Sequence, residues 1–120
     1  MRAEIRFSQN FNNKLACEYF TTYRLKEDNY RIGETFSILL NNKLIYYADI
    51  IDIEHTFLDN VSDVDAMLDM GVTAAEFRRR FRVFYKDIDF KTRAISKIVL
   101  KRLPNQRDMA KKQTSEAATA

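Results

Sequence analysis

The order of elements at the start of the chain is set by residues 3–25, which read AEIRFSQNFNNKLACEYFTTYRL. The opening predicts a strand, because apolar Ile5 and Phe7 alternate with charged neighbours at the period of two that a half-buried strand requires. Residues 20–25 are rich in aromatic and β-branched side chains and predict a second strand. The stretch therefore predicts a strand, a connecting segment and a strand.

The connecting segment has the apolar spacing of a short helix. Phe11, Leu15 and Tyr19 recur at intervals of four, which would place them on one helical face. Ser8 precedes this run and is a candidate N-cap. The pattern predicts a helix that ends close to Tyr19.

The junction between this helix and the second strand concentrates side chains suited to holding a ligand. Tyr19 and Tyr23 offer rings for stacking on a base, Thr22 offers a hydroxyl, and Arg24 offers a guanidinium for a phosphate or a base edge. The alternative is a structural role, in which Tyr19 packs in the helix core, Thr22 packs in the strand and Arg24 is exposed to solvent. The residues alone leave both interpretations open.

At these residues the chain resembles the ASCH domain, a family with the PUA-like β-barrel fold. That family opens with a strand, a helix and a Gly-x-Lys-x-x-Thr-x-Arg motif that leads into a strand and a Gly-Asp turn. The resemblance covers residues 3–103 and places the Thr-x-Arg on Thr22 and Arg24. It places the turn on Gly33 and Glu34.

The chain departs from the family at positions that matter for chemistry. Some ASCH members are amidohydrolases of acetylated cytidine, and the resemblance implies a lysine where this chain has Tyr19 and an acid where it has Met70, with Asp69 beside it. Cys17 also replaces the motif's glycine. A phenol titrates near ~10 and cannot serve as a base near neutral pH. The resemblance therefore implies the fold without the amidohydrolase activity.

Composition predicts one folded domain. The 120 residues are 46% hydrophobic and 12% aromatic, which supports a single core, and the net charge is only +3. The domain is expected over residues 1–103, with a flexible polar tail over residues 104–120. A single cysteine fits a reducing compartment, and no apolar run approaches the roughly 18 residues of a membrane span. We expect a cytoplasmic protein with no membrane association.

Further strands are predicted in the middle and at the end of the domain. Residues 35–40 and 43–57 are predicted to be the two strands of a hairpin. Asn41-Asn42 would form its two-residue turn, because asparagine tolerates positive φ. The apolar parity of the second strand slips near Ile50 and Ile51, which predicts a β-bulge. Residues 94–103 predict the last strand.

Two helices are predicted between these strands. Ser62 and Thr73 each begin a capping-box pattern, and Gly71 is placed to end the first helix. Strands outnumber helices in a mixed order, so the expected fold is α+β, a small mixed β-barrel with two or three short helices, closed to remove exposed strand edges. The predicted core contains Ile5, Phe7, Leu15, Ile38, Ile53, Phe77, Phe81 and Ile98. Phe84 and Tyr85 share the helix face of Phe77 and Phe81.

Several kinds of site are excluded by residue counts. One histidine and one cysteine cannot build a zinc site, and two glycines cannot build a phosphate-binding glycine loop. A Ser-His-Asp triad would need His55, whose strand-like surroundings favour a structural role. We expect no metal and no cofactor.

A second candidate surface is an arginine cluster on the second helix. Arg78, Arg79 and Arg82 lie in a run of one sign and would suit a polyanion. The alternative is the solvated face of an amphipathic helix.

Three functional hypotheses remain. The first is a non-catalytic module that binds RNA or a nucleotide-like ligand beside Tyr19, Thr22, Tyr23 and Arg24. The second is a diverged nucleoside amidohydrolase or a nuclease that uses Asp69 or Glu34 as its acid. The third is a structural or adaptor protein that binds protein partners in a larger assembly, keeps the fold and leaves the pocket unused. Tyr19 and Met70 favour the first over the second.

Overall fold

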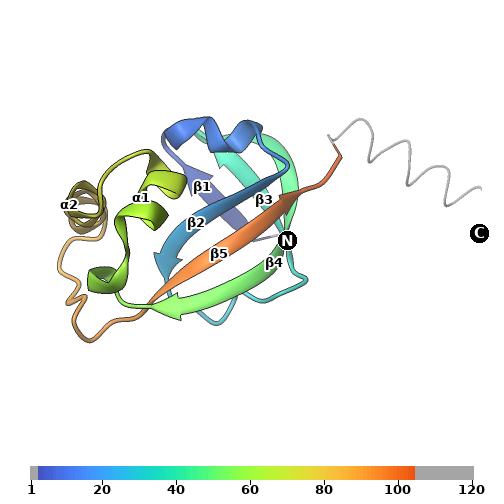
Figure 1. Cartoon of the computed structure of the whole chain (residues 1–120). Helices are drawn as coiled ribbons and strands as arrows, with labels where there is room; N and C mark the ends of the chain where they lie inside the picture. The colour runs from blue at the N-terminus through green and yellow to red at the C-terminus, as the bar shows by residue number, and fades with distance from the viewer. Residues whose placement is uncertain (1–2, 105–120) are drawn as a thin grey trace, which may run out of the picture.

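A computed structural model describes residues 3–104 as a mixed α+β domain with a curled five-stranded sheet (Figure 1). The two α-helices gather at one end of the sheet. In chain order the elements are β1 (Glu4–Phe7), η1 (Phe11–Ala16), β2 (Tyr19–Leu25), β3 (Thr35–Leu40), β4 (Lys43–Thr56), η2 (Leu58–Asn60), α1 (Asp63–Met70), α2 (Ala74–Phe84) and β5 (Ile95–Arg102); η1 and η2 are 3-10 helices.

The sheet has the strand order β1-β3-β4-β5-β2. The β1-β3 pair is parallel and the other three pairs are antiparallel. Among the described residues, β1 and β2 end the sheet and do not pair with each other, so the barrel is half formed. The backbone closure expected from the sequence is absent there, and we call the space between these two edges the seam.

The hairpin and the bulge are confirmed. Asn41 and Asn42 have φ of 52° and 66°, the left-handed values that a two-residue turn between β3 and β4 needs. The register of β4 against β5 shifts between Ile50 and Asp52. A bulge there increases the local twist and helps the long β4 strand curl.

Both predicted helix caps are also confirmed. The Ser62 hydroxyl accepts a hydrogen bond from the Asp65 amide, and the Thr73 hydroxyl accepts one from the Glu76 amide. Gly71 ends α1 with φ of 74°, a conformation that glycine adopts without a Cβ penalty. These local signals fix where α1 and α2 begin and where α1 ends.

The helix predicted from Phe11 to Tyr19 begins at Phe11 but ends at Ala16, before Tyr19. Tyr19 is the first residue of β2. The backbone of Asn12 and Asn13 is left-handed, with φ of 56° and 52°, so only a kinked 3-10 segment forms. Ser8 makes no cap; instead the Asn10 side chain accepts a hydrogen bond from the Leu15 amide.

The core has two parts that β2 separates. Phe20 joins the cluster inside the curled sheet, and Tyr23 joins the cluster between the sheet and the helices. Every predicted core residue is buried except Ile53, which is partly buried against the first cluster. Because side chains alternate along a strand, β2 presents Thr22 and Arg24 to one cluster and Thr21 and Tyr23 to the other.

Two expectations concern the limits of this domain. No helix within residues 3–104 has the length and apolar character needed to cross a bilayer. The predicted flexible tail, apart from Pro104, lies outside the described residues.

Candidate functional site

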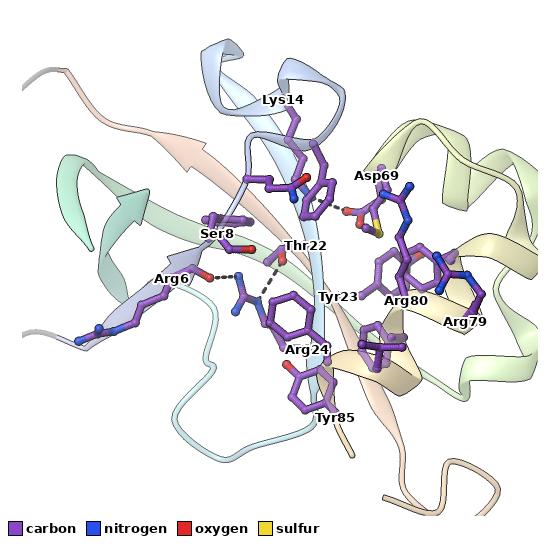
Figure 2. A pocket seen from close by; sticks show the side chains of 18 residues that line it. Arg6, Ser8, Lys14, Thr22, Tyr23, Arg24, Asp69, Arg79, Arg80 and Tyr85 are labelled. Carbon is purple, nitrogen blue, oxygen red and sulfur yellow. Dashed lines mark hydrogen bonds and ion pairs between the residues drawn. The ribbon is translucent and has the colours of Figure 1, made fainter. Parts of the chain in front are cut away.

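A cavity of about 380 Å³ opens at the seam, where β1 and β2 face α2 (Figure 2). Its volume falls within the roughly 300–1,000 Å³ of small-molecule sites. Figure 2 places Arg6 and Ser8 on one side, Arg79 and Arg80 on the other, and Thr22 and Arg24 between them. Its charged lining comprises Arg6, Lys14, Arg24, Arg79, Arg80 and Asp69. Its aromatic lining comprises Phe7, Phe11, Tyr23, Phe77, Phe81, Phe84 and Tyr85.

Arg24 bridges the seam. Its Nε donates a hydrogen bond of 3.1 Å to the Thr22 hydroxyl, and its Nη2 donates one of 2.8 Å to the Arg6 carbonyl oxygen on β1. The guanidinium carbon lies 4.8 Å from the centre of the Phe7 ring, a cation-π contact. These contacts fix the plane of the guanidinium at the wall of the cavity.

A buried ion pair forms another part of the wall. Lys14 Nζ lies 2.9 Å from Asp69 Oδ1, and the Thr21 hydroxyl donates a 2.8 Å hydrogen bond to the same oxygen. Lys14 is 6% exposed and Asp69 is 3% exposed. Burial lowers the pKa of the Lys14 ammonium, and Asp69 opposes that shift. The pair ties η1 to α1 beside β2.

Helix α2 contributes a second, solvated ion cluster. The Arg79 guanidinium donates to both carboxylate oxygens of Glu76, at 2.9 and 2.6 Å, and Arg80 Nε donates to one of them at 3.0 Å. These hydrogen bonds lower the pKa of Glu76 to about 2. Arg79 and Arg80 line the cavity, whereas Glu76 does not.

The aromatic residues differ in how much surface they offer a ligand. The Tyr23 ring meets Phe77 edge to face at 5.2 Å and is buried, which raises the pKa of its phenol. Tyr23 therefore serves packing, and its ring is not free to stack on a base. Phe84 is 62% exposed at the rim, although its helical position predicted a core role beside Phe81.

The predicted ligand-binding residues are only partly brought together. Thr22, Tyr23 and Arg24 line the cavity. Tyr19 does not: it is 52% exposed, and the Lys101 ammonium lies 6.0 Å from its ring centre. Glu34 lines a separate hollow near the β2–β3 loop. Tyr19 is corrected from a cavity residue to a surface residue.

The predicted arginine cluster is divided in the same way. Arg79 reaches the cavity, but Arg78 donates a 3.4 Å hydrogen bond to the Val61 carbonyl oxygen. Arg82 forms a 3.5 Å ion pair with Asp59 on the surface. The three arginines thus have different partners: the Val61 carbonyl oxygen for Arg78, Glu76 for Arg79 and Asp59 for Arg82.

Sequence reasoning missed Lys14, Arg80 and Phe84 as cavity residues. Asp69, the acid beside Met70, does line the cavity, and so does Lys14, which lies outside the residues that the sequence singled out. No spacing signal joins Lys14 to Asp69, because they meet only when η1 packs against α1. Phe84 shares the Phe77 helical face, which is the same signal that a core residue gives.

No group of three metal-ligating side chains occurs among the described residues. Comparisons of the chain with protein-family models, with curated proteins and with solved structures find no match.

Proposed function

We propose that the seam cavity binds one nucleotide unit of a single-stranded RNA and that the domain is a non-catalytic binding module of ASCH/PUA-like type. The observation that carries this proposal is the fixed guanidinium of Arg24 in a cationic cavity with an exposed aromatic ring at its rim. Such a set of groups can bind a phosphate, a base edge and a base face at the same time.

Electrostatics favours an anionic ligand. Of the five cationic side chains that line the cavity, Lys14 pairs with Asp69, the one carboxylate in the lining, and four arginines remain. Arg6 also pairs with Glu4, and Arg79 and Arg80 with Glu76, at carboxylates outside the lining. Partly enclosed walls strengthen the attraction relative to open water, because the local dielectric constant is lower. A phosphate group meets this requirement.

The aromatic rim favours a base beside that phosphate. Phe84 is exposed, and stacking on such a ring is worth about 1–3 kcal/mol per base. Arg24 is held in a fixed orientation by Thr22 and by the Arg6 carbonyl oxygen, so its remaining N–H groups are oriented before a ligand arrives. A fixed donor loses less entropy on binding than a mobile one.

A hydrolase is the second candidate, because Lys14 and Asp69 supply the lysine and the acid that Tyr19 and Met70 lack. The geometry of the pair argues against it. Lys14 and Asp69 are buried and bonded to each other, and the bonded carboxylate oxygen also accepts a hydrogen bond from Thr21. Neither group is a free base, so binding remains the leading proposal.

The test is the affinity of the chain for a fluorescent single-stranded RNA octamer, measured by anisotropy at two salt concentrations. We expect Arg24→Ala to weaken binding by about 1–3 kcal/mol, because it removes an oriented base-edge contact. Arg82→Ala is the matched control, since Arg82 and its ion-pair partner Asp59 both lie outside the cavity lining. We expect the control to stay within about twofold of wild type.

Two outcomes would contradict the proposal. If wild type binds no RNA at low salt, where electrostatic attraction is strongest, the adaptor hypothesis takes its place. If Arg82→Ala weakens binding as much as Arg24→Ala, the contact is a diffuse charge effect on the surface. Thermal melts of both variants check that folding is unchanged.

A further inference from the structure

The two arginines that α2 brings to the cavity are held by a residue outside its lining. Arg79 and Arg80 both face the cavity, yet both donate to Glu76, which lies one helical turn earlier. Glu76 occupies the position where its carboxylate would reach back to the amide of Thr73 in a complete capping box. Its carboxylate bonds the two arginines instead.

The arginines retain unused hydrogen-bond donors. A guanidinium has five N–H groups; Arg79 uses two of them on Glu76 and Arg80 uses one. Their remaining donors suit an oxyanion with several acceptor oxygens. A phosphate monoester offers three such oxygens and a charge of about −1.5 to −2 at neutral pH, compared with −1 for a carboxylate.

The bond to Glu76 is of the kind that a stronger anion displaces. The Arg79 side chain is 63% exposed, and the two pairs have the i,i+3 and i,i+4 spacings of a helix surface. Exposed pairs of this kind contribute little net free energy, because water solvates both charges when they separate. Lys14 and Asp69 are buried, so water would not solvate their charges if that pair separated.

We propose that Arg79 and Arg80 form a subsite for the terminal phosphate monoester of a nucleotide or RNA end, and that Glu76 is the internal counter-ion that this phosphate displaces. The subsite rests on the proposed nucleotide binding and specifies the group that the ligand presents to α2. It favours a terminal phosphate over an internal phosphodiester, which carries a single negative charge.

The test compares AMP with adenosine by isothermal titration calorimetry on the full chain. We expect wild type to bind AMP about tenfold or more tightly than adenosine. Glu76→Gln should tighten AMP binding about three- to tenfold, because it removes a competing negative charge near the phosphate, and should leave adenosine unchanged. Glutamine is accepted at this helical position, so the variant retains the α2 start.

Asp59→Asn is the matched control, since it removes a carboxylate that pairs with another α2 arginine outside the cavity. We expect it to change AMP affinity by less than about twofold. Arg80→Gln should reduce the preference for AMP. If Glu76→Gln leaves AMP binding unchanged or weakens it, Glu76 positions the arginines and does not compete.

The remaining outcomes separate this subsite from the proposed function. Equal binding of AMP and adenosine by wild type would overturn the phosphate subsite while nucleotide binding stands. Failure of the chain to bind AMP, adenosine and the RNA octamer would overturn the proposed function and the subsite together.

Discussion

Two ion clusters border the same cavity and differ in their surroundings. Lys14 and Asp69 come from segments 55 residues apart and are almost completely buried. Glu76, Arg79 and Arg80 lie within one and a half turns of α2 and are solvated. The hydrogen-bond lengths are similar, so distance alone does not distinguish them.

The difference shows that burial decides what an ion pair can do. A buried charge that loses its partner remains desolvated, and the cost falls on the folded state. An exposed charge that loses its partner is hydrated again at little cost. We therefore assign Lys14 and Asp69 to holding the wall of the cavity, and the α2 cluster to exchange with a ligand.

The largest expected effect comes from breaking the buried pair. Asp69→Leu leaves the Lys14 ammonium buried without a counter-charge and removes the acceptor of the Thr21 hydroxyl. We expect the free energy of unfolding to fall by about 3–5 kcal/mol, measured by urea denaturation. The double variant Lys14→Met/Asp69→Leu removes both charges and should recover most of that loss. If Asp69→Leu alone lowers the free energy of unfolding by less than about 1 kcal/mol, water reaches Lys14.

A smaller effect is expected at the end of α1, which positions Asp69. Gly71 has φ of 74°, and an added Cβ would lie 3.4 Å from Asn12 Oδ1. The Asn12 amide also donates to the Met67 and Leu68 carbonyl oxygens. Gly71→Ala should cost about 1–2 kcal/mol in a urea titration, because a side chain disfavours the left-handed conformation.

Gly33→Ala is the control for this change. Gly33 has φ of 93° with nothing within 4 Å of an added Cβ, and it lines the separate hollow near Glu34, so an alanine there is strained in the backbone outside the cavity. We expect Gly71→Ala alone to weaken RNA binding in the anisotropy assay. Equal RNA affinities for the two variants would mean that the end of α1 does not control the cavity wall.

The smallest expected effect is the contribution of Glu76 to stability. Its pKa is about 2 in the folded chain against an ordinary value of 4.5, so the contribution is fully present above pH 4.5 and is lost as the pH falls toward 2. The melting temperature of wild type should slightly exceed that of Glu76→Gln at pH 7, and the gap should close near pH 2. Circular dichroism melts across this range measure it. If the difference in melting temperature persists at pH 2, the charge of Glu76 is not its cause.

The features that sequence predicted well have local causes. Ser62 and Thr73 cap their helices through amides three residues away, and Asn41 and Asn42 make a two-residue turn. These interactions depend on neighbours in the chain, so the residue types alone indicate them. The strands of the domain follow from alternation in the same way.

The features that were missed depend on distant partners or on competing local signals. The period of four through Tyr19 predicted a helix, but the left-handed backbone of Asn12 and Asn13 interrupts it. The meeting of Lys14 with Asp69 depends on how η1 packs against α1. Alternation of apolar residues likewise predicts where strands lie in the chain but not which strands pair. It therefore did not predict that β1 and β2 would remain unpaired at the seam.

The position of β2 in the sheet has a consequence for synthesis on the ribosome. Among the described strands β2 pairs only with β5, and Tyr19 lies opposite Lys101. Residues 19–25 therefore emerge from the ribosome several seconds before their partner strand, at the usual rate of about 5–20 residues per second. Thr22 and Arg24 cannot take their places at the cavity wall until β5 inserts between β4 and β2. A nascent chain that ends between Tyr85 and Ile95 has every residue that lines the cavity but lacks the strand that completes it.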